Sequence, residues 1–208
     1  MIRILIVDDH PVVREGLKLI LSRTGTMEIT GEAADGAEAS VKLAKEEYDM
    51  VLLDIALPGR NGMDVLKEIK KHYPKLPVLV CSMHGEEEYG LRALRSGASG
   101  YLTKKSAANE LVAAVHKVLQ GGKYISQTLA EKLADAVAGD GGAPHQGLSD
   151  REYQVLCMIA SGMTVGEIAR EMSLNIKTVS TYRTRILIKM NMKSNADLNR
   201  YAIRNNLI

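Results

Sequence analysis

The sequence predicts two domains of different class, an α/β domain built on an open parallel sheet and then an all-α domain. Over the first 120 residues, short apolar segments alternate five times with amphipathic helical segments. Such alternation is typical of a parallel sheet covered by helices on both faces, with right-handed crossovers. From Leu148 onward the pattern is helical only. A chain of 208 residues is long enough for two such domains, each with its own core.

Strands are expected where short apolar runs end at polar or turn residues, which gives 2–7, 28–32, 50–53, 77–81 and 100–103. Between them we expect helices at 11–23, 36–46, 61–72, 87–96 and 107–120. In the first helix the predicted apolar stripe consists of Val12, Leu17, Ile20 and Leu21. Gly121-Gly122 ends the last helix in the usual C-cap manner. The α/β domain is therefore predicted to span 1–120.

Residues 121–147 are predicted to be a linker. A short helix is expected over 126–138, with Leu129, Leu133, Ala136 and Val137 on its apolar side. The following Gly139-Asp140-Gly141-Gly142-Ala143-Pro144 has the composition of a flexible hinge.

The all-α domain is predicted to span 148–208 and to contain a helix-turn-helix. Capping boxes begin at Ser149 and Thr164, and Ser194 gives a related start signal. Helices are expected at 150–161, 165–172, 176–191 and 195–204. The second and third are joined by the tight connection Ser173-Leu174-Asn175, as in a helix-turn-helix.

The composition is that of a globular, water-soluble protein, with 46% hydrophobic and 25% charged residues. No apolar run approaches the length needed to span a bilayer, and the N-terminus leads directly into a strand, not a signal peptide. Cys81 and Cys157 lie in different predicted domains within apolar stretches, which favours buried free thiols over a disulfide or a zinc site. We therefore expect a cytoplasmic protein without a membrane partner.

Four of the expected strands end on polar residues of complementary chemistry: Asp8-Asp9, Asp54, Ser82 and Lys104. Alone, each residue has an ordinary explanation; Asp8 or Asp9, for example, would cap the helix that opens at Pro11. In an open parallel sheet, however, all strand carboxyl ends lie along the edge where ligands bind. The convergence of four such ends therefore predicts a binding site.

These residues fit a site that takes a phosphoryl group on Asp54. A carboxylate that attacks an anionic phosphoryl donor needs a divalent cation, and Mg²⁺ prefers oxygen ligands. Asp8, Asp9 and Asp54 would supply them, together with a backbone carbonyl just past Asp54, that of Ala56. Lys104 would neutralise a transferred phosphoryl oxygen and Ser82 would hydrogen-bond another.

Residues 1–120 resemble the receiver domain of two-component response regulators over their full length. Asp8-Asp9, Asp54, Ser82 and Lys104 match that family's acidic pair, phosphoacceptor, switch hydroxyl and lysine. Lys104 fits better than Lys105 because it directly follows Tyr101-Leu102-Thr103, and Tyr101 matches the switch aromatic residue. The resemblance implies a flavodoxin-like (β/α)₅ fold, a need for Mg²⁺ and phosphorylation by a sensor histidine kinase.

An enzymatic alternative is a phosphatase of the haloacid-dehalogenase type, which also uses an aspartyl nucleophile on a related sheet. Such enzymes need a second acid two residues after the nucleophile, and that position is Ala56. Alanine cannot act as a general acid or base. We therefore expect a phosphoaspartate that persists as a signal, and no turnover enzyme.

The net charge of +2 conceals a basic element in the all-α domain. Residues 175–193 contain five basic residues and no acid. Such a concentrated basic element favours a polyanionic partner, although a charge run alone is more often a solvated face. Ile176, Val179, Tyr182, Ile186 and Met190 define the predicted buried face of the third helix. The opposite face carries small hydroxyl residues between basic ones, which suits a helix that enters a DNA major groove.

Residues 148–208 resemble the LuxR/FixJ-type helix-turn-helix output domain. The resemblance rests on Leu148-Ser149-Asp150-Arg151-Glu152, Gly162-Met163-Thr164, Glu167-Ile168-Ala169 and Lys177-Thr178-Val179-Ser180-Thr181-Tyr182. It implies base-facing positions at Ser180, Thr181 and Thr184, and dimerisation through the last helix. The expected DNA-contacting residues are Lys177, Thr178, Ser180, Thr181, Arg183, Thr184, Arg185, Lys189 and Lys193; the expected dimerisation residues are Leu198, Tyr201 and Ala202.

Ile188 departs from that pattern, which commonly has a polar residue at this exposed position. It is either a singly exposed apolar residue, which is ordinary, or a contact to the receiver, a partner or the DNA flank. The leading interpretation of the chain is a response regulator of the NarL/FixJ class that binds double-stranded DNA as a phosphorylated homodimer. The alternative is a receiver-controlled adaptor whose helical domain binds protein or RNA, and the salt dependence of duplex binding would separate the two.

Overall fold

The computed structural model describes residues 1–58, 61–106, 108–138, 143–205 and 207–208. It divides into two compact units, Met1–Ala130 and Glu131–Ile208, here called the sheet unit and the helical unit. Among the described residues, no helix has both the length and the apolar character needed to cross a membrane. The predicted fold class, an α/β domain followed by an all-α domain, is confirmed.

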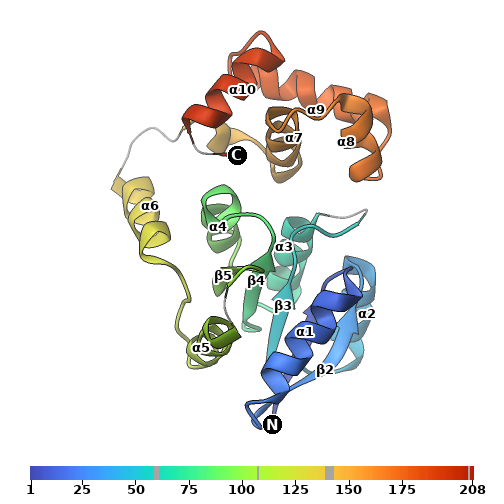
Figure 1. Ribbon diagram of the computed structural model, residues 1–208, viewed down its shortest axis with the longest axis vertical. Coiled ribbons are helices and arrows are strands. Elements are labelled where there is room, and N and C mark those ends of the chain that lie inside the picture. Colours follow the sequence, from blue (N-terminus) through green and yellow to red (C-terminus); the bar gives the residue numbers. More distant parts are fainter. Residues whose placement is uncertain (59–60, 107, 139–142, 206) are drawn as a thin grey trace. The chain divides into compact units, whose positions relative to one another are not determined.

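The sheet unit contains five parallel strands in the order β2-β1-β3-β4-β5 (Figure 1). Helices α1 and α5 pack together over a core that includes Ile4, Ile6, Leu52 and Leu79 of the sheet, and α2 and α3 contact each other elsewhere on it. The strands are β1 (Ile2–Val7), β2 (Met27–Ala33), β3 (Met50–Leu53), β4 (Val78–Ser82) and β5 (Gly100–Thr103). The helices are α1 (Pro11–Ser22), α2 (Gly36–Lys45), α3 (Gly62–His72), α4 (Glu86–Arg95) and α5 (Ala108–Leu119).

One residue of the predicted apolar stripe of α1 was wrong. Val12 is 84% exposed, while the next residue, Val13, is half-buried and shares the inner side of the helix with Leu17 and Ile20. Pro11 and Val12 form the first turn of α1, which extends beyond the strand ends, and both are exposed to solvent.

The chain after α5 packs onto the edge of the sheet. Tyr124 forms a parallel bridge with Gly100 of β5, and the Lys123 ammonium donates to the Ala98 carbonyl over 2.6 Å. Helix α6 (Gln127–Ala138) then begins at α4: the Ser126 hydroxyl donates to the Glu86 carboxylate, and buried Leu129 lies against Gly90. The first half of the predicted linker therefore packs against α4 and β5. The predicted hinge lies largely outside the described residues, and Pro144 begins the 3₁₀ helix η1 (Pro144–Gly147).

The helical unit is built around α7 (Asp150–Ala160), which contacts α8 (Val165–Glu171), α9 (Ile176–Lys189) and α10 (Asn195–Arg204). The capping boxes predicted at Ser149 and Thr164 are present, and Ser194, for which only a related start signal was predicted, also forms a capping box. Ser173 has φ +53° in the tight turn between α8 and α9. Within this unit His145 of η1 reaches α10, since its Nδ1 lies 2.7 Å from the Tyr201 hydroxyl.

The predicted buried face of α9 is correct for Val179, Ile186 and Met190, and Tyr182 is partly buried. It was wrong for Ile176, which is 59% exposed. Ile176 is the first residue of α9 and lines the open groove between α8 and α9, where no described element covers it.

Candidate functional site

The carboxyl edge of the sheet brings the four predicted strand ends together. Backbone hydrogen bonds continue the parallel pairing just beyond the strands: Asp54 N donates to the Val7 carbonyl over 2.9 Å, and Lys104 N donates to the Ser82 carbonyl over 2.7 Å. Each polar residue is therefore held at the same level as its neighbour on the next strand. Local sequence places these residues at strand ends, and sheet pairing makes them one site.

Lys104 lies between two carboxylates. Its Nζ is 2.7 Å from Asp8 Oδ2 and 2.6 Å from Asp54 Oδ2, and both acids are buried, with 2% of each exposed. Burial by itself lowers the pKa of Lys104, but the hydrogen bonds and charges of Asp54 and Asp8 outweigh it, so that this pKa lies above its ordinary value. The adjacent Lys105 is exposed. The structure thus has Lys104, the lysine chosen from the sequence, against the two acids.

The acidic residues form a cluster that fits a hard divalent cation. One ligand atom from each of Asp8, Asp9, His10 and Asp54 can lie within 4.8 Å of the others. Asp9 Oδ1 is buried and accepts no hydrogen bond from any described residue, although His10 Nδ1 lies 2.8 Å away. A buried carboxylate oxygen that accepts no hydrogen bond from the described residues, beside two further carboxylates, matches the oxygen ligands that Mg²⁺ prefers.

His10 was not singled out from the sequence as part of this cluster. Its backbone N–H donates to Asp8 Oδ1 over 2.9 Å, which helps to orient that carboxylate. The signal that would have found it is its position directly after Asp8-Asp9, before the helix opened by Pro11. Near Asp54, the Ala56 backbone N–H donates to Asp54 Oδ1 over 3.1 Å, so the turn after β3 contacts the carboxylate directly.

The two residues expected to act as a switch share one neighbour, His84. Buried Ser82 accepts a hydrogen bond at Oγ from the His84 N–H over 3.3 Å, and the Tyr101 hydroxyl donates to the His84 carbonyl over 3.0 Å. Tyr101 is 2% exposed, so its ring is buried within the sheet unit. Sequence reasoning missed His84, which no pattern marks. Next to Ser82, burial raises the pKa of the Cys81 thiol to about 12, which makes that cysteine a poor nucleophile.

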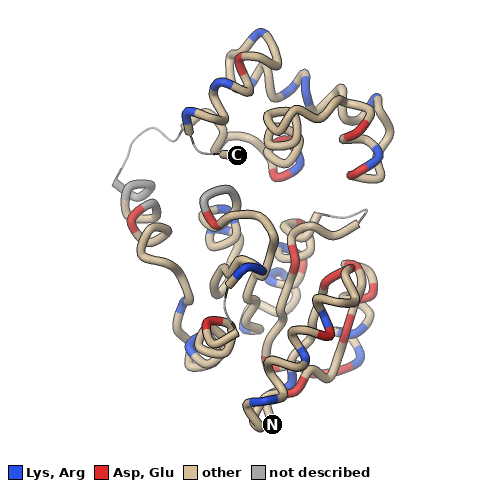
Figure 2. Tube along the Cα trace, in the orientation of Figure 1, with Lys and Arg blue, Asp and Glu red and all other residues tan. Residues whose placement is uncertain are grey.

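In the helical unit, α9 presents a polar and basic face. Figure 2 shows Lys and Arg, and no acidic residue, along this helix. The predicted groove-facing residues Ser180, Thr181 and Thr184 lie on this helix, and the two threonines are exposed, as are Lys177 and Arg185. Ser180 is exposed as well. The exposed face is therefore contiguous and available to a polyanion.

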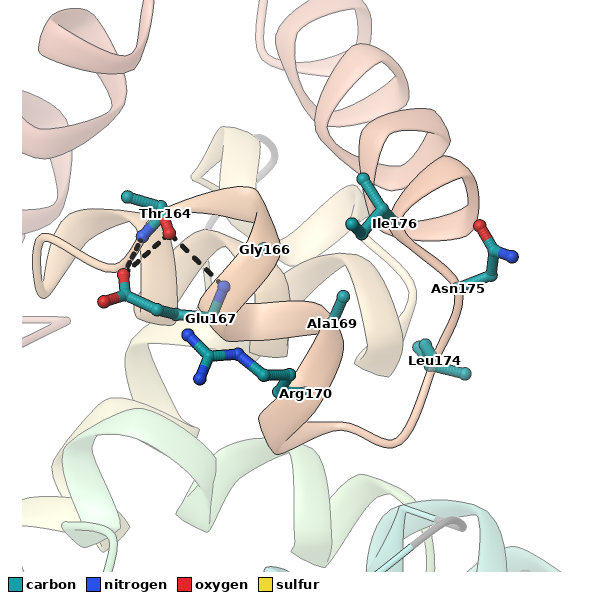
Figure 3. Close-up of a pocket in the computed structure, with 8 residues that line it drawn as sticks. All are labelled: Thr164, Gly166, Glu167, Ala169, Arg170, Leu174, Asn175 and Ile176. Atoms are coloured by element: carbon teal, nitrogen blue, oxygen red, sulfur yellow. Dashed lines mark hydrogen bonds between the residues drawn. The ribbon is translucent and has the colours of Figure 1, made fainter.

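An open groove lies beside the start of α9 (Figure 3). It is lined by Thr164, Gly166, Glu167, Ala169, Arg170, Leu174, Asn175 and Ile176. The Thr164 side chain caps α8 through the Glu167 N–H, and the Asn175 side chain caps α9 through the Lys177 N–H. These caps satisfy backbone N–H groups in the first turns of α8 and α9.

Two basic residues that we expected to contact phosphates are engaged inside the helical unit. Lys189 Nζ lies 2.6 Å from Glu152 Oε2, and Arg183 Nε donates to Asn195 Oδ1 over 2.6 Å. Glu152 is buried; burial raises its pKa, but the Lys189 and Ser149 hydrogen bonds lower it further, so that its pKa lies below the ordinary value. Lys189 therefore helps to hold α9 against the start of α7.

The expected dimerisation residues require a correction. Leu198 and Ala202 are fully buried and pack inside the helical unit, where they cannot face a second protomer. Tyr201 is partly buried beside His145. The solvent-facing side of α10 includes Arg200 and Ile203, the latter 63% exposed. The helical period explains the error, since the apolar residues of α10 are those that hold it to α7.

Comparison with known proteins matches a different protein family to each of the two units. The response regulator receiver domain matches residues 4–116, and the luxR family of bacterial regulatory proteins matches residues 146–202. The oxygen regulatory protein NreC of Staphylococcus carnosus is 34% identical over 214 residues, 99% of each chain. The response regulator UvrY of Escherichia coli is 33% identical over 209 residues, 100% of this chain and 96% of UvrY.

A similar solved structure is that of RcsB from Salmonella enterica serovar Typhimurium, bound to the promoter rprA in the presence of the phosphomimetic BeF3⁻. Its TM-score is 0.67 at 27% identity, and the match covers 96% of this chain and 97% of RcsB. Both domains and their order are thus shared along the full length of these proteins. The chain belongs to the NarL/FixJ family of two-component response regulators, transcriptional regulators that join a receiver domain to a LuxR-type DNA-binding domain.

Proposed function

We propose that a sensor histidine kinase phosphorylates Asp54 and that this controls binding of the chain, as a homodimer, to double-stranded DNA. The observation that carries the proposal is the position of Lys104, within 2.7 Å of both Asp8 and Asp54 at the edge of an acidic cluster. A nucleophilic carboxylate, a cation site and a fixed ammonium group are the parts that phosphoryl transfer needs.

The side chains at this edge have distinct roles in the transfer. Asp8, Asp9, Asp54 and the backbone carbonyl of Ala56 would hold Mg²⁺, which when bound offsets the repulsion between carboxylate and phosphoryl donor. An Asp54 oxygen forms the new bond to phosphorus while the bond from phosphorus to the kinase histidine nitrogen breaks. Lys104 then neutralises a phosphoryl oxygen, and the Ser82 hydroxyl donates to another. Since Ala56 offers no general acid, the acyl phosphate persists as a signal.

The signal leaves the site through His84, because that residue contacts both Ser82 and Tyr101. When the Ser82 hydroxyl turns toward a phosphoryl oxygen, its bond with the His84 N–H changes, and the His84 carbonyl that Tyr101 holds shifts with it. A ligand can bias such a switch only through contacts that differ between two states. The Ser82 contact supplies that difference, and α4, which begins just after His84, carries the change to the surface.

In the helical unit, α9 enters the major groove and its basic residues contact phosphates. The exposed side of α10, with Arg200 and Ile203, pairs two protomers. The RcsB structures support this proposal: one is bound to a promoter in the presence of a phosphomimetic, and another contains two dimers on two DNAs.

A mass measurement tests the receiver half of the proposal. Incubation with acetyl phosphate and Mg²⁺ should add one phosphate to the wild type and none to Asp54→Asn or in EDTA. Asp35→Asn is the matched control, because Asp35 also follows a strand and caps α2, and Asn caps a helix equally well. Phosphate that survives Asp54→Asn, or forms equally well in EDTA, contradicts the assignment.

Fluorescence anisotropy on a duplex selected from random DNA tests the output half. We expect affinity to rise on phosphorylation and to fall steeply with salt, with a preference for the selected sequence. Equal, weak binding to every duplex, together with tight binding to a protein or RNA, would instead favour the adaptor function.

A further inference from the structure

The groove-facing side of α9 exposes methyl groups where its sequence suggests hydroxyl groups. The Thr181 hydroxyl donates to the Lys177 carbonyl over 2.9 Å, and the Thr184 hydroxyl donates to the Ser180 carbonyl over 3.1 Å. Both side chains are exposed. With the oxygen on Cβ turned back onto the preceding turn of the helix, the γ-methyl is the branch that each threonine presents outward.

Ile188 continues the same stripe. It follows Thr184 by one helical turn and is 73% exposed, so it adds an apolar branched side chain in line with the two threonine methyls. Lys177 lies one turn before Thr181, at the start of the stripe, Arg185 lies on one side of the stripe and Ser180 on the other, and all three are exposed. The middle of the stripe is therefore apolar, and positive charge lies at its start and on one side.

Such a surface has one counterpart in the major groove of DNA. Guanine, cytosine and adenine present hydrogen-bonding atoms there, whereas thymine adds a C5-methyl group, which apolar side chains and the threonine methyl contact. An apolar stripe against any other base edge would leave groove donors and acceptors without partners, which is costly. The positive charges at the start and on one side of the stripe match the phosphates that border the groove.

We propose that Thr181, Thr184 and Ile188 make this chain specific for thymine C5-methyl groups, and that the two threonines recognise bases through their methyls and not through their hydroxyls. The inference rests on the proposed function, since it requires that α9 enters the major groove. It also explains Ile188, because an exposed apolar residue on a DNA-binding face is expected where the groove itself is apolar.

Thymine-to-uracil replacement in the DNA tests the proposal directly, because it removes only the C5-methyl. The full-length protein, treated with acetyl phosphate, first selects a duplex from random DNA. Each thymine of one half-site is then replaced by deoxyuridine in turn, and affinity is measured by anisotropy. We expect one to three positions at which affinity falls about fourfold, the ratio that corresponds to about 0.8 kcal/mol for burying one such group. Deoxyuridine outside the half-sites is the control and should change nothing.

Two substitutions of Thr184 separate its methyl from its hydroxyl. Thr184→Ser keeps the hydroxyl and removes the methyl, so its affinity for the thymine duplex should be about fourfold below that of the wild type. On the matching uracil duplex its affinity should equal that of the wild type, because the methyl contact is already absent. Thr184→Val keeps the methyl and removes the hydroxyl, so it should retain both affinity and uracil sensitivity. Thr128→Ser, at an exposed threonine of α6 outside the DNA-binding helix, should leave uracil sensitivity unchanged. Circular dichroism checks that each variant keeps its helices.

The outcomes distinguish the inference from the function on which it rests. Uracil insensitivity at every position, together with loss of binding in Thr184→Val, would show that the hydroxyls recognise the bases and would overturn the inference alone. Selection of a duplex with no thymine within its half-sites would do the same. Failure to bind any duplex, phosphorylated or not, would overturn the proposed function itself.

Discussion

Replacing Lys189 by Met should destabilise the helical unit, because it leaves the buried carboxylate of Glu152 without its cationic partner. A hydrogen bond to a charged group contributes about 1.5–3 kcal/mol. Two features reduce this figure here: the Lys189 side chain is 43% exposed and therefore screened by water, and Glu152 keeps its bonds from the Ser149 N–H and hydroxyl. We expect a loss of about 1–2 kcal/mol in the free energy of unfolding.

Differential scanning calorimetry of the full chain measures this loss, since the two units have separate cores. For a unit of this size, 1 kcal/mol corresponds to a shift in Tm of about 4–8 °C, so Lys189→Met should lower the Tm of the helical unit by roughly 5–10 °C at pH 7. Lys177→Met, at an exposed lysine of the same helix, is the control and should change Tm little.

The pH dependence of the free energy of unfolding tests the same ion pair independently. The pKa of Glu152 is lower in the folded chain than its ordinary value of 4.5. Its ion pair therefore contributes stability that is fully present above pH 4.5 and is lost as pH falls through the lowered pKa. The Tm difference between wild type and Lys189→Met should shrink below that pH. Equal Tm values at pH 7, or a difference that stays constant into acid, would refute the reasoning.

Four other substitutions test the remaining contacts. Ser82→Ala should still accept phosphate on Asp54 but gain little DNA affinity from it. Fluorescence anisotropy with and without acetyl phosphate measures this gain, and a gain equal to that of wild type would exclude Ser82 from the signal route. Lys193→Ala should weaken binding to all duplexes alike and flatten the salt slope by about one unit, whereas a change confined to one sequence would place Lys193 at a base. Leu129→Ala should release α6 from α4, seen as faster amide exchange over 127–138 with an unchanged Tm of the sheet unit; unchanged exchange would mean that Leu129 does not hold α6. Ile203→Asp should keep the phosphorylated chain monomeric in analytical ultracentrifugation, and a persistent dimer would exclude that side of α10.

Much of the fold and of the receiver site was predictable because local patterns determine both. Short apolar runs predicted every strand to within one residue at each end, and N-terminal capping signals predicted where α7, α8 and α10 begin. Asp8, Asp54, Ser82 and Lys104 could be grouped before any coordinates because parallel strands have their carboxyl ends at the same edge. Side-chain period is a property of the local sequence, and the alternation of strands with helices predicts that the strands pair in parallel.

What the sequence left open depends on which elements pack against which. Leu198 and Ala202 were expected at a dimer surface, yet they are buried within the helical unit, and Ile176 was expected in the core, yet it lines an open groove. Lys189 was predicted as a phosphate contact, and the sequence did not reveal that Glu152, 37 residues away in the chain, lies within 2.6 Å of it.

The sequence by itself determined the domain order, the strands and helices, and the chemistry at the edge of the sheet, because these follow from short-range periodicity and from residue type. Only the tertiary structure decided that His84 joins Ser82 to Tyr101 and that Glu152 pairs with Lys189 of α9. The physical reason is that burial and pairing belong to contacts between segments far apart in the chain, and residue type and spacing do not specify the partner of each side chain.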